Sequence, residues 1–147
     1  MQHLIDYRNT NIFFKDMLTK AADYLGIEMS EHTGFYLMSL LSHFADSSIP
    51  DQPLGPQLFT KTEPSERIIA LKEIGDTSLF VSGFFNKNMK YYYTIGATAY
   101  DELSFKFKAS SLHGVYKDLC RRFVEFMKLL SEIKTQCKND MHLWKLI

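Results

Sequence analysis

The chain has 147 residues, of which 46% are hydrophobic and 14% aromatic, and its 17 basic and 17 acidic residues cancel. A chain of this length can bury roughly two thirds of its unfolded surface, so we expect one globular domain. The longest apolar-rich runs, Phe35 to Leu41 and Leu79 to Phe85, fall short of the roughly 18 apolar residues that a membrane span requires. The first residues, MQHLIDYRNTN, lack the basic start and apolar core of a signal peptide, and we expect a soluble, cytoplasmic protein.

Charge is unevenly distributed along the chain. Residues 1–80 carry 6 basic and 11 acidic side chains, a net charge of −5, whereas residues 81–147 carry 11 and 6, a net charge of +5. The two halves either pair within the fold or present a basic C-terminal face to an acidic partner. The candidate basic face consists of Lys117, Arg121 and Lys128. An ordinary solvated helix surface is the simpler explanation.

Apolar residues recur at helical spacing in the first third of the chain. The pattern predicts a helix over Asn9–Leu25, which Gly26 would end in a left-handed conformation. Ser30 is a typical N-cap for a second helix over Glu31–Ala45. The apolar surface of this second helix is broad enough to suggest a central position; it comprises Phe35, Leu37, Met38, Leu41 and Phe44.

The periodicity is lost from Asp46 to Pro64, where DSSIPDQPLGPQ holds three of the four prolines. We predict a Pro-rich loop here, and a crossover between distant helix ends is preferred over a lid. Pro64 then suits the first turn of a third helix. That helix either runs through to about Phe84 with a packed glycine inside it, or breaks and restarts with Asp76 as N-cap.

The second half of the chain also predicts helices. One is expected over Asn88–Leu103, and the alternation of phenylalanine and lysine from Phe105 to Lys108 is interpreted as a connection rather than a strand. A last long helix begins near Ser111 and carries apolar residues to Ile133. After it, the short terminal piece MHLWKLI is expected to dock Trp144 and Leu146.

Three glycines stand beside large aromatic residues in the stretch Leu71–Leu103. Gly75, Gly83 and Gly96 each cost a helix about 1 kcal/mol relative to alanine, which suggests that backbones approach closely there. Their spacing is too wide for a dinucleotide-binding loop, and the sequence contains no GxxxxGK[ST] phosphate loop. The stretch is therefore interpreted as a helix-packing region.

Catalytic and metal-binding patterns are scarce in the sequence. The histidines lack the spacing of a zinc or haem motif: His32 and His43 would share a helix face but lie about 16 Å apart. No GxSxG sequence occurs. We expect no metal and no cofactor. The cysteines, Cys120 and Cys137, are interpreted as reduced thiols, with a thiolate favoured by neighbouring arginines as the minor alternative for Cys120.

Asp76 is the carboxylate of greatest interest, because it lies between glycine and threonine in an apolar setting. A buried carboxylate needs hydrogen-bond partners, which tyrosines can supply. The candidate polar cluster is Asp76, Ser82, Tyr92 and Tyr100. A helix cap or a structural hydrogen bond is preferred over general acid or base chemistry.

Nucleic-acid binding would use basic residues interleaved with aromatic ones. A modest version of this pattern consists of Phe105, Lys106, Phe107, Lys108, Lys117, Arg121 and Arg122. The neutral overall charge argues against high nonspecific affinity, and no helix-turn-helix is marked.

The central block, from Gly75-Asp76 through Ser82-Gly83-Phe84-Phe85 and Tyr91-Tyr92 to Gly96 and Ala99-Tyr100, resembles a group of small, uncharacterised bacterial proteins with a GD, SGFF, YY, G and AY pattern in this order. The resemblance covers about half of the chain. It implies a bacterial, cytoplasmic origin and supplies no mechanism.

Together these patterns predict a single all-α domain of five or six helices. The leading hypothesis for function is a non-enzymatic protein-interaction or adaptor module, with self-association as one form of it, because apolar helix surface is abundant and catalytic signatures are absent. The alternative is a small-molecule-binding protein or an unrecognised enzyme with a helical pocket around Asp76 and Tyr92.

Overall fold

The computed structural model describes residues 7–46 and 54–137, and within these ranges the chain is helical and contains no strand. The predicted single all-α domain is confirmed. Six helices have ten residues or more and one is a single short turn. They are α1 (Tyr7–Leu25), α2 (Glu31–Asp46), α3 (Gln57–Thr60), α4 (Pro64–Phe85), α5 (Met89–Lys106), α6 (Leu112–Arg121) and α7 (Phe123–Cys137).

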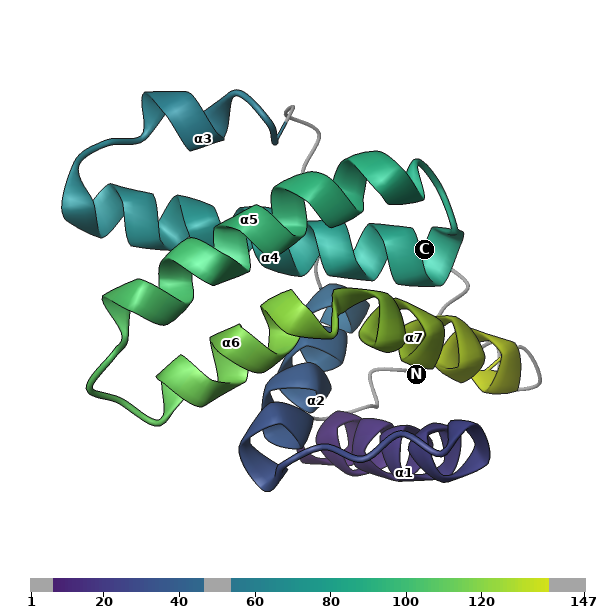
Figure 1. Ribbon diagram of the computed structural model, residues 1–147. Coiled ribbons are helices and arrows are strands. Elements are labelled where there is room, and N and C mark those ends of the chain that lie inside the picture. Colours follow the sequence, from purple (N-terminus) through teal and green to yellow (C-terminus); the bar gives the residue numbers. More distant parts are fainter. Residues whose placement is uncertain (1–6, 47–53, 138–147) are drawn as a thin grey trace.

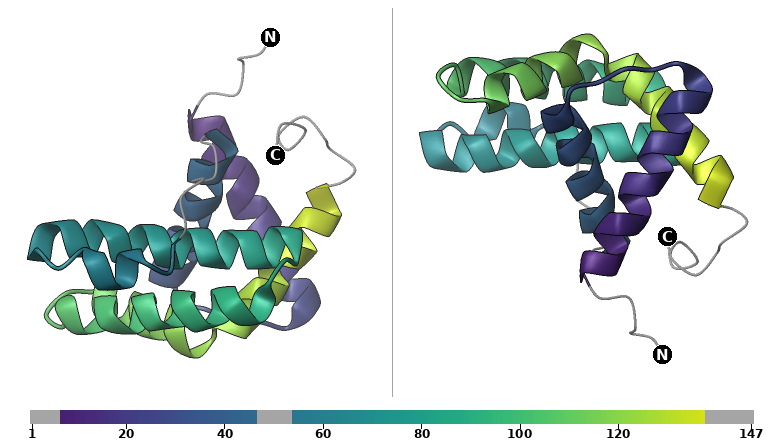
Figure 2. Two further views of the ribbon diagram at one scale, coloured as in Figure 1. Left: turned by 90° about the horizontal axis from the view of Figure 1, so that it is seen from above. Right: turned by 90° about the horizontal axis from the view of Figure 1, so that it is seen from below.

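The helices form crossed pairs around α4. Helices α4 and α5 lie side by side and run in opposite directions, joined by a short connection, and α6 and α7 follow beneath them (Figure 1). Helices α1 and α2 run across this assembly at a steep angle (Figure 2). Helix α4 contacts α2, α3, α5 and α7 and is the central element, while α2 contacts α1, α4 and α6.

Local sequence signals set the helix ends as predicted. Ser30 Oγ accepts a hydrogen bond from the amide of Thr33 at 3.1 Å, which caps α2. Gly26 ends α1 with φ +71°, in the left-handed region. Pro64 is the first residue of α4, and the side chain of Glu63 before it accepts from the amide of Glu66 at 3.1 Å.

Helix α4 is continuous across Gly75 and Asp76, which decides between the two alternatives left open by the sequence. Every residue from Ile74 to Phe84 is buried. A helix that is covered on all sides carries apolar residues all round, so it shows no polar stripe from which its course could be predicted.

The three glycines lie where another helix comes close. A Cβ at Gly75 would lie 2.6 Å from a ring atom of Tyr100 on α5, and one at Gly96 would lie 2.7 Å from the ring of Phe123 on α7. At Gly83 it would lie 2.8 Å from Cβ of Leu130 on α7. The predicted close approach of helices is confirmed at all three positions.

The predicted last long helix is wrong in one respect, because it is divided into α6 and α7 at Arg122. The guanidinium of Arg122 donates to the carbonyl of Glu28, in the α1–α2 connection, at 2.6 Å and to Glu125 Oε2 at 2.8 Å. Phe123 next to it is fully buried. The hydrogen bond to the distant carbonyl of Glu28 and the burial of Phe123 hold the bend, and no glycine or proline marks it in the sequence.

The connections between the helices agree only in part with the predictions, in the part of the chain that the structure describes. The Pro-rich loop contains the short helix α3, and its residues 47–53 lie outside the described part, as do Trp144 and Leu146. The segment Phe105–Lys108 is not a strand, as predicted, but only its second half is a connection, because Phe105 and Lys106 belong to the last turn of α5. Among the described residues, no helix has the length and apolar character needed to cross a bilayer.

Candidate functional site

The carboxylate of Asp76 is the centre of a buried polar cluster. Its Oδ1 accepts hydrogen bonds from the hydroxyls of Tyr36 at 2.7 Å and Tyr100 at 2.9 Å. Its Oδ2 accepts from Nζ of Lys72 at 2.7 Å, one helical turn earlier on α4. The cluster therefore joins α2, α4 and α5, and both carboxylate oxygens are occupied.

Tyr116 of α6 completes the aromatic wall of this cluster. Its ring meets Tyr36 edge to face at a centroid distance of 5.4 Å and stacks on Tyr100 at 5.9 Å. The hydroxyl of Tyr36 also lies 3.4 Å from that of Tyr116. Nζ of Lys72 lies 5.0 Å from the centroid of the Tyr36 ring, which places a cation on the face of that ring.

Burial and the carboxylate together hold the tyrosines in their neutral form. Burial raises the pKa of Tyr100 well above its ordinary value, and the nearby charge of Asp76 raises it further. The pKa of Tyr36 is raised for the same two reasons, in the same order. A phenol with a raised pKa is a poor proton donor near neutral pH, so the tyrosines serve the carboxylate as hydrogen-bond donors.

Lys72 does not have the character of a nucleophilic lysine. Partial burial lowers the pKa of its ammonium group, but the charge of Asp76 and the hydrogen bond to it outweigh this effect and leave the pKa raised. A nucleophilic lysine needs the opposite, a pKa low enough to leave the amine neutral. The geometry of the cluster is that of a structural link among three helices.

The four residues of the predicted polar cluster are only partly brought together. Asp76 and Tyr100 are bonded to each other. Ser82 instead donates to the carbonyl of Ser78 at 2.7 Å within α4, and the ring of Tyr92 packs edge to face against Tyr91. Neither Ser82 nor Tyr92 forms a hydrogen bond to Asp76 in the described part of the chain.

Three members of the cluster were missed by the sequence interpretation. Lys72 stands four residues before Asp76, and this spacing places opposite charges side by side on a helix, so it offered a usable signal. Tyr36 and Tyr116 lie 40 residues from Asp76 in either direction. Nothing local in the sequence marks them, because their contacts depend on how α2 and α6 pack.

A surface groove lies between α2 and α4 beside this cluster, with a volume of about 510 Å³. Its polar lining includes His43, Lys72, Glu73 and the edge of Asp76. Because Asp76 is only 8% exposed and its oxygens are already bonded, the groove presents a covered carboxylate to solvent.

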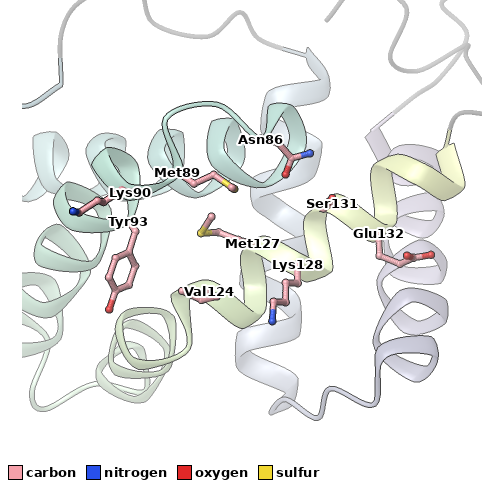
Figure 3. A pocket seen from close by; sticks show the side chains of 9 residues that line it. All are labelled: Asn86, Met89, Lys90, Tyr93, Val124, Met127, Lys128, Ser131 and Glu132. Carbon is pink, nitrogen blue, oxygen red and sulfur yellow. The ribbon is translucent and has the colours of Figure 1, made fainter.

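A second groove, of about 460 Å³, runs between the first turns of α5 and the length of α7 (Figure 3). Figure 3 shows the side chains of Met89 and Met127 in the space between the two helices, with Val124 and the ring of Tyr93 beside them. Met89, Tyr93 and Val124 are 46%, 44% and 47% exposed. We call this the α5–α7 groove; its polar lining residues are Asn86, Lys90, Lys128, Ser131 and Glu132.

A third groove, of about 790 Å³, lies between α1 and α2. Its apolar lining consists of Leu18, Ala22, Ile27, Met29, Phe35 and Met38, and Phe35 is 66% exposed. The sequence predicted Phe35 as part of the apolar surface of the second helix. In the structure it lies on the outer face of α2 instead. The charged lining residues are Lys15, Asp23, Glu28 and Glu31.

The predicted basic face is divided by the bend at Arg122. Lys117 and Arg121 on α6 line a groove toward the start of α2, together with His32 and Thr33. Lys128 on α7 lines the α5–α7 groove instead. The three cations therefore do not share one surface.

Cys120 lacks the character of a reactive thiol. Burial raises the pKa of Cys120, and Asp101 raises it further, which together exceed the opposite effect of Arg121. The thiolate alternative is therefore not supported. Within residues 7–46 and 54–137, no group of three or more histidine, cysteine, aspartate or glutamate side chains is arranged to hold a metal ion.

Comparison with protein-family models, with curated proteins and with solved structures finds no match to this chain.

Proposed function

We propose that this protein is a protein-interaction module whose contact surface is the α5–α7 groove. The observation that carries the proposal is the apolar character of this groove, in which Met89 and Val124 remain nearly half exposed. Exposed apolar surface gathered in a concave site is typical of places where a partner binds. The bacterial, cytoplasmic origin that the central sequence block implies remains part of the same proposal.

The shape and chemistry of the groove favour an amphipathic helix as its occupant. Two antiparallel or crossed helices form an elongated apolar channel into which a third helix can lay its apolar face. Methionines suit such a surface, because their flexible, polarizable side chains adapt to different partners. Lys90 and Lys128 in the lining outnumber Glu132, so a helix with acidic residues beside its apolar face fits best.

The alternative, a pocket around Asp76 and Tyr92, has less support. The carboxylate has three donors bonded to it, and Tyr92 packs elsewhere. A ligand at this place would have to displace hydrogen bonds that already satisfy a buried charge, at a cost in free energy.

Selection of peptides from a displayed library of amphipathic helices tests the proposal. The full chain should enrich helical peptides with acidic residues flanking an apolar stripe, and these should lose binding to Met89→Glu and Val124→Glu. Both positions are partly exposed, so the variants should keep the fold. Ile69→Glu, at a 71% exposed position on α4, is the matched control and should bind like the wild type.

Peptides that bind the wild type and both groove variants equally well would show that the α5–α7 groove is not the contact surface. The proposal would also be contradicted if the selection yielded no peptide that binds the wild type more tightly than it binds Met89→Glu and Val124→Glu.

A further inference from the structure

We infer that the occupant of the α5–α7 groove is a second copy of this chain, which docks through the α1–α2 face around Phe35. The inference rests on the proposed function, because it names the partner for the same groove. It uses two surfaces that belong to different helices of one molecule and whose lining residues carry opposite net charge.

The α1–α2 face, which surrounds the third groove, carries exposed apolar surface. Phe35 on α2, in the lining of this groove, is 66% exposed. The receiving groove offers Met89, Tyr93 and Val124, each nearly half exposed. Aromatic and methionine side chains are the types enriched at the centres of protein interfaces.

The charges around the two surfaces are opposite. On the α1–α2 face, Asp23, Glu28 and Glu31 outnumber Lys15. In the α5–α7 groove, Lys90 and Lys128 outnumber Glu132. The uneven charge of the chain, −5 over residues 1–80 and +5 over residues 81–147, thus reappears as an acidic apolar face and a basic apolar groove. Surfaces of opposite charge attract during encounter and fix the register of the contact.

The contact joins two different surfaces, an acidic face and a basic groove. A two-fold dimer forms both contacts at once, and where the geometry prevents this, the same contact repeats head to tail into a ring or an open chain. Association should therefore depend on protein concentration.

Two double variants with reversed charges test the two sides of the contact independently. Lys90→Glu with Lys128→Glu changes the groove, and Asp23→Lys with Glu28→Lys changes the face; all four side chains are exposed. The wild-type full chain should self-associate in sedimentation velocity at low salt, and less so at high salt, where charges are screened. Each double variant alone should be a monomer, because its face and its groove then carry the same sign.

An equimolar mixture of the two double variants is the decisive sample. The acidic face is unchanged in the variant with Lys90→Glu and Lys128→Glu, and the basic groove is unchanged in the variant with Asp23→Lys and Glu28→Lys. These two unchanged surfaces should bind each other, so that association returns. Lys108→Glu and Asp101→Lys, exposed positions outside both surfaces, should associate like the wild type. Circular dichroism on every variant should show wild-type helix content and thermal unfolding.

Other results would overturn the inference. These are a monomeric wild type up to its solubility limit, a mixture that stays monomeric, double variants that still associate, or control variants that do not. If the wild type is monomeric while the selected acidic peptides still bind the groove, self-association fails and the proposed function stands. If neither occurs, both fail.

Discussion

The ring of Tyr100 covers Gly75, and its hydroxyl binds the carboxylate of the residue that follows this glycine. A Cβ at Gly75 would lie 2.6 Å from Cε1 of the ring, and Tyr100 Oη lies 2.9 Å from Asp76 Oδ1. Because Tyr100 is fully buried and packs against the rings of Tyr116 and Phe123, its ring can shift only if those rings move too. Two adjacent residues of α4 thus fix one side chain of α5 by shape and by hydrogen bonding.

Gly75→Ala should therefore destabilise the protein, although alanine is the better helix former. Overpacking against a fixed ring costs about 1–3 kcal/mol, and the helix-propensity gain of at most about 1 kcal/mol offsets only part of it. Urea unfolding should show a lower free energy of unfolding for this variant.

Gly114→Ala is the matched control for that measurement. A Cβ at Gly114, in α6, would meet no atom within 4 Å, so the methyl group of the alanine lies in open space. The substitution should stabilise by roughly 0.5 kcal/mol through helix propensity alone. Equal effects of the two substitutions would contradict the contact between Gly75 and Tyr100.

Asp76→Asn should lower the free energy of unfolding by roughly 2 kcal/mol. The tyrosine hydroxyls would then donate to a neutral oxygen instead of a charged one, and the amide would present hydrogens toward Lys72. Under the structural interpretation, binding of the selected peptides to the α5–α7 groove should be unchanged in the fraction that is folded.

Tyr92→Phe is the companion substitution, because the sequence placed Tyr92 in the same candidate cluster. Its ring packs edge to face against Tyr91, and removal of its hydroxyl should change the free energy of unfolding by less than about 0.5 kcal/mol, as for substitutions away from buried networks. A decrease in the free energy of unfolding as large as that of Asp76→Asn would show that Tyr92 does belong to the polar cluster.

Stability should fall in alkaline solution. The pKa values of Tyr36 and Tyr100 are raised above the ordinary value of 10.0, and that of Lys72 above 10.5. A group whose pKa is raised on folding contributes stability that is complete below its unfolded pKa and is lost as the pH rises toward its folded pKa. The free energy of unfolding should therefore stay level at about pH 7–9 and decline above about pH 10.

Tyr100→Phe should make that decline shallower, since one of the groups responsible is removed. Phenolate absorbance offers an independent check, because the buried tyrosines should ionise only as the protein unfolds. Ionisation of Tyr100 at an ordinary pKa in the folded protein would contradict the cluster.

Ser78→Ala should be neutral or stabilise by about 1 kcal/mol. Ser78 is fully buried on α4, and its Oγ has no hydrogen-bond partner in the part of the chain that the structure describes. An unsatisfied buried hydroxyl costs free energy that its removal recovers. Ser42→Ala is the control: Ser42 is equally buried in a helix, but its Oγ donates to Asn11 Oδ1 at 2.6 Å, so its removal should destabilise.

The sequence allowed the helices and most of their ends to be predicted, because the signals involved are local. Ser30, Pro64 and Gly26 act within a few residues of their own positions. The bend at Arg122 was not predictable in this way, since it depends on a hydrogen bond to the carbonyl of Glu28, far away in the chain.

The candidate sites show the same division between local and distant signals. The partnership of Asp76 with a tyrosine followed from the cost of burying a charge, and Lys72 was within reach of a spacing rule. The identities of Tyr36 and Tyr116 required the packing of α2 and α6. The α5–α7 groove required the crossing of two helices that the linear pattern does not place together.

Hydrogen–deuterium exchange on the full chain tests most directly whether copies of this chain associate through the α5–α7 groove rather than through the surface near Asp76. Exchange is compared between a dilute sample and a concentrated one. Slower exchange in the concentrated sample is expected in the first turns of α5, along α7 and on the α1–α2 face, with no change around Asp76 in α4. Protection confined to α4 near Asp76, or no difference between the two samples, would contradict it.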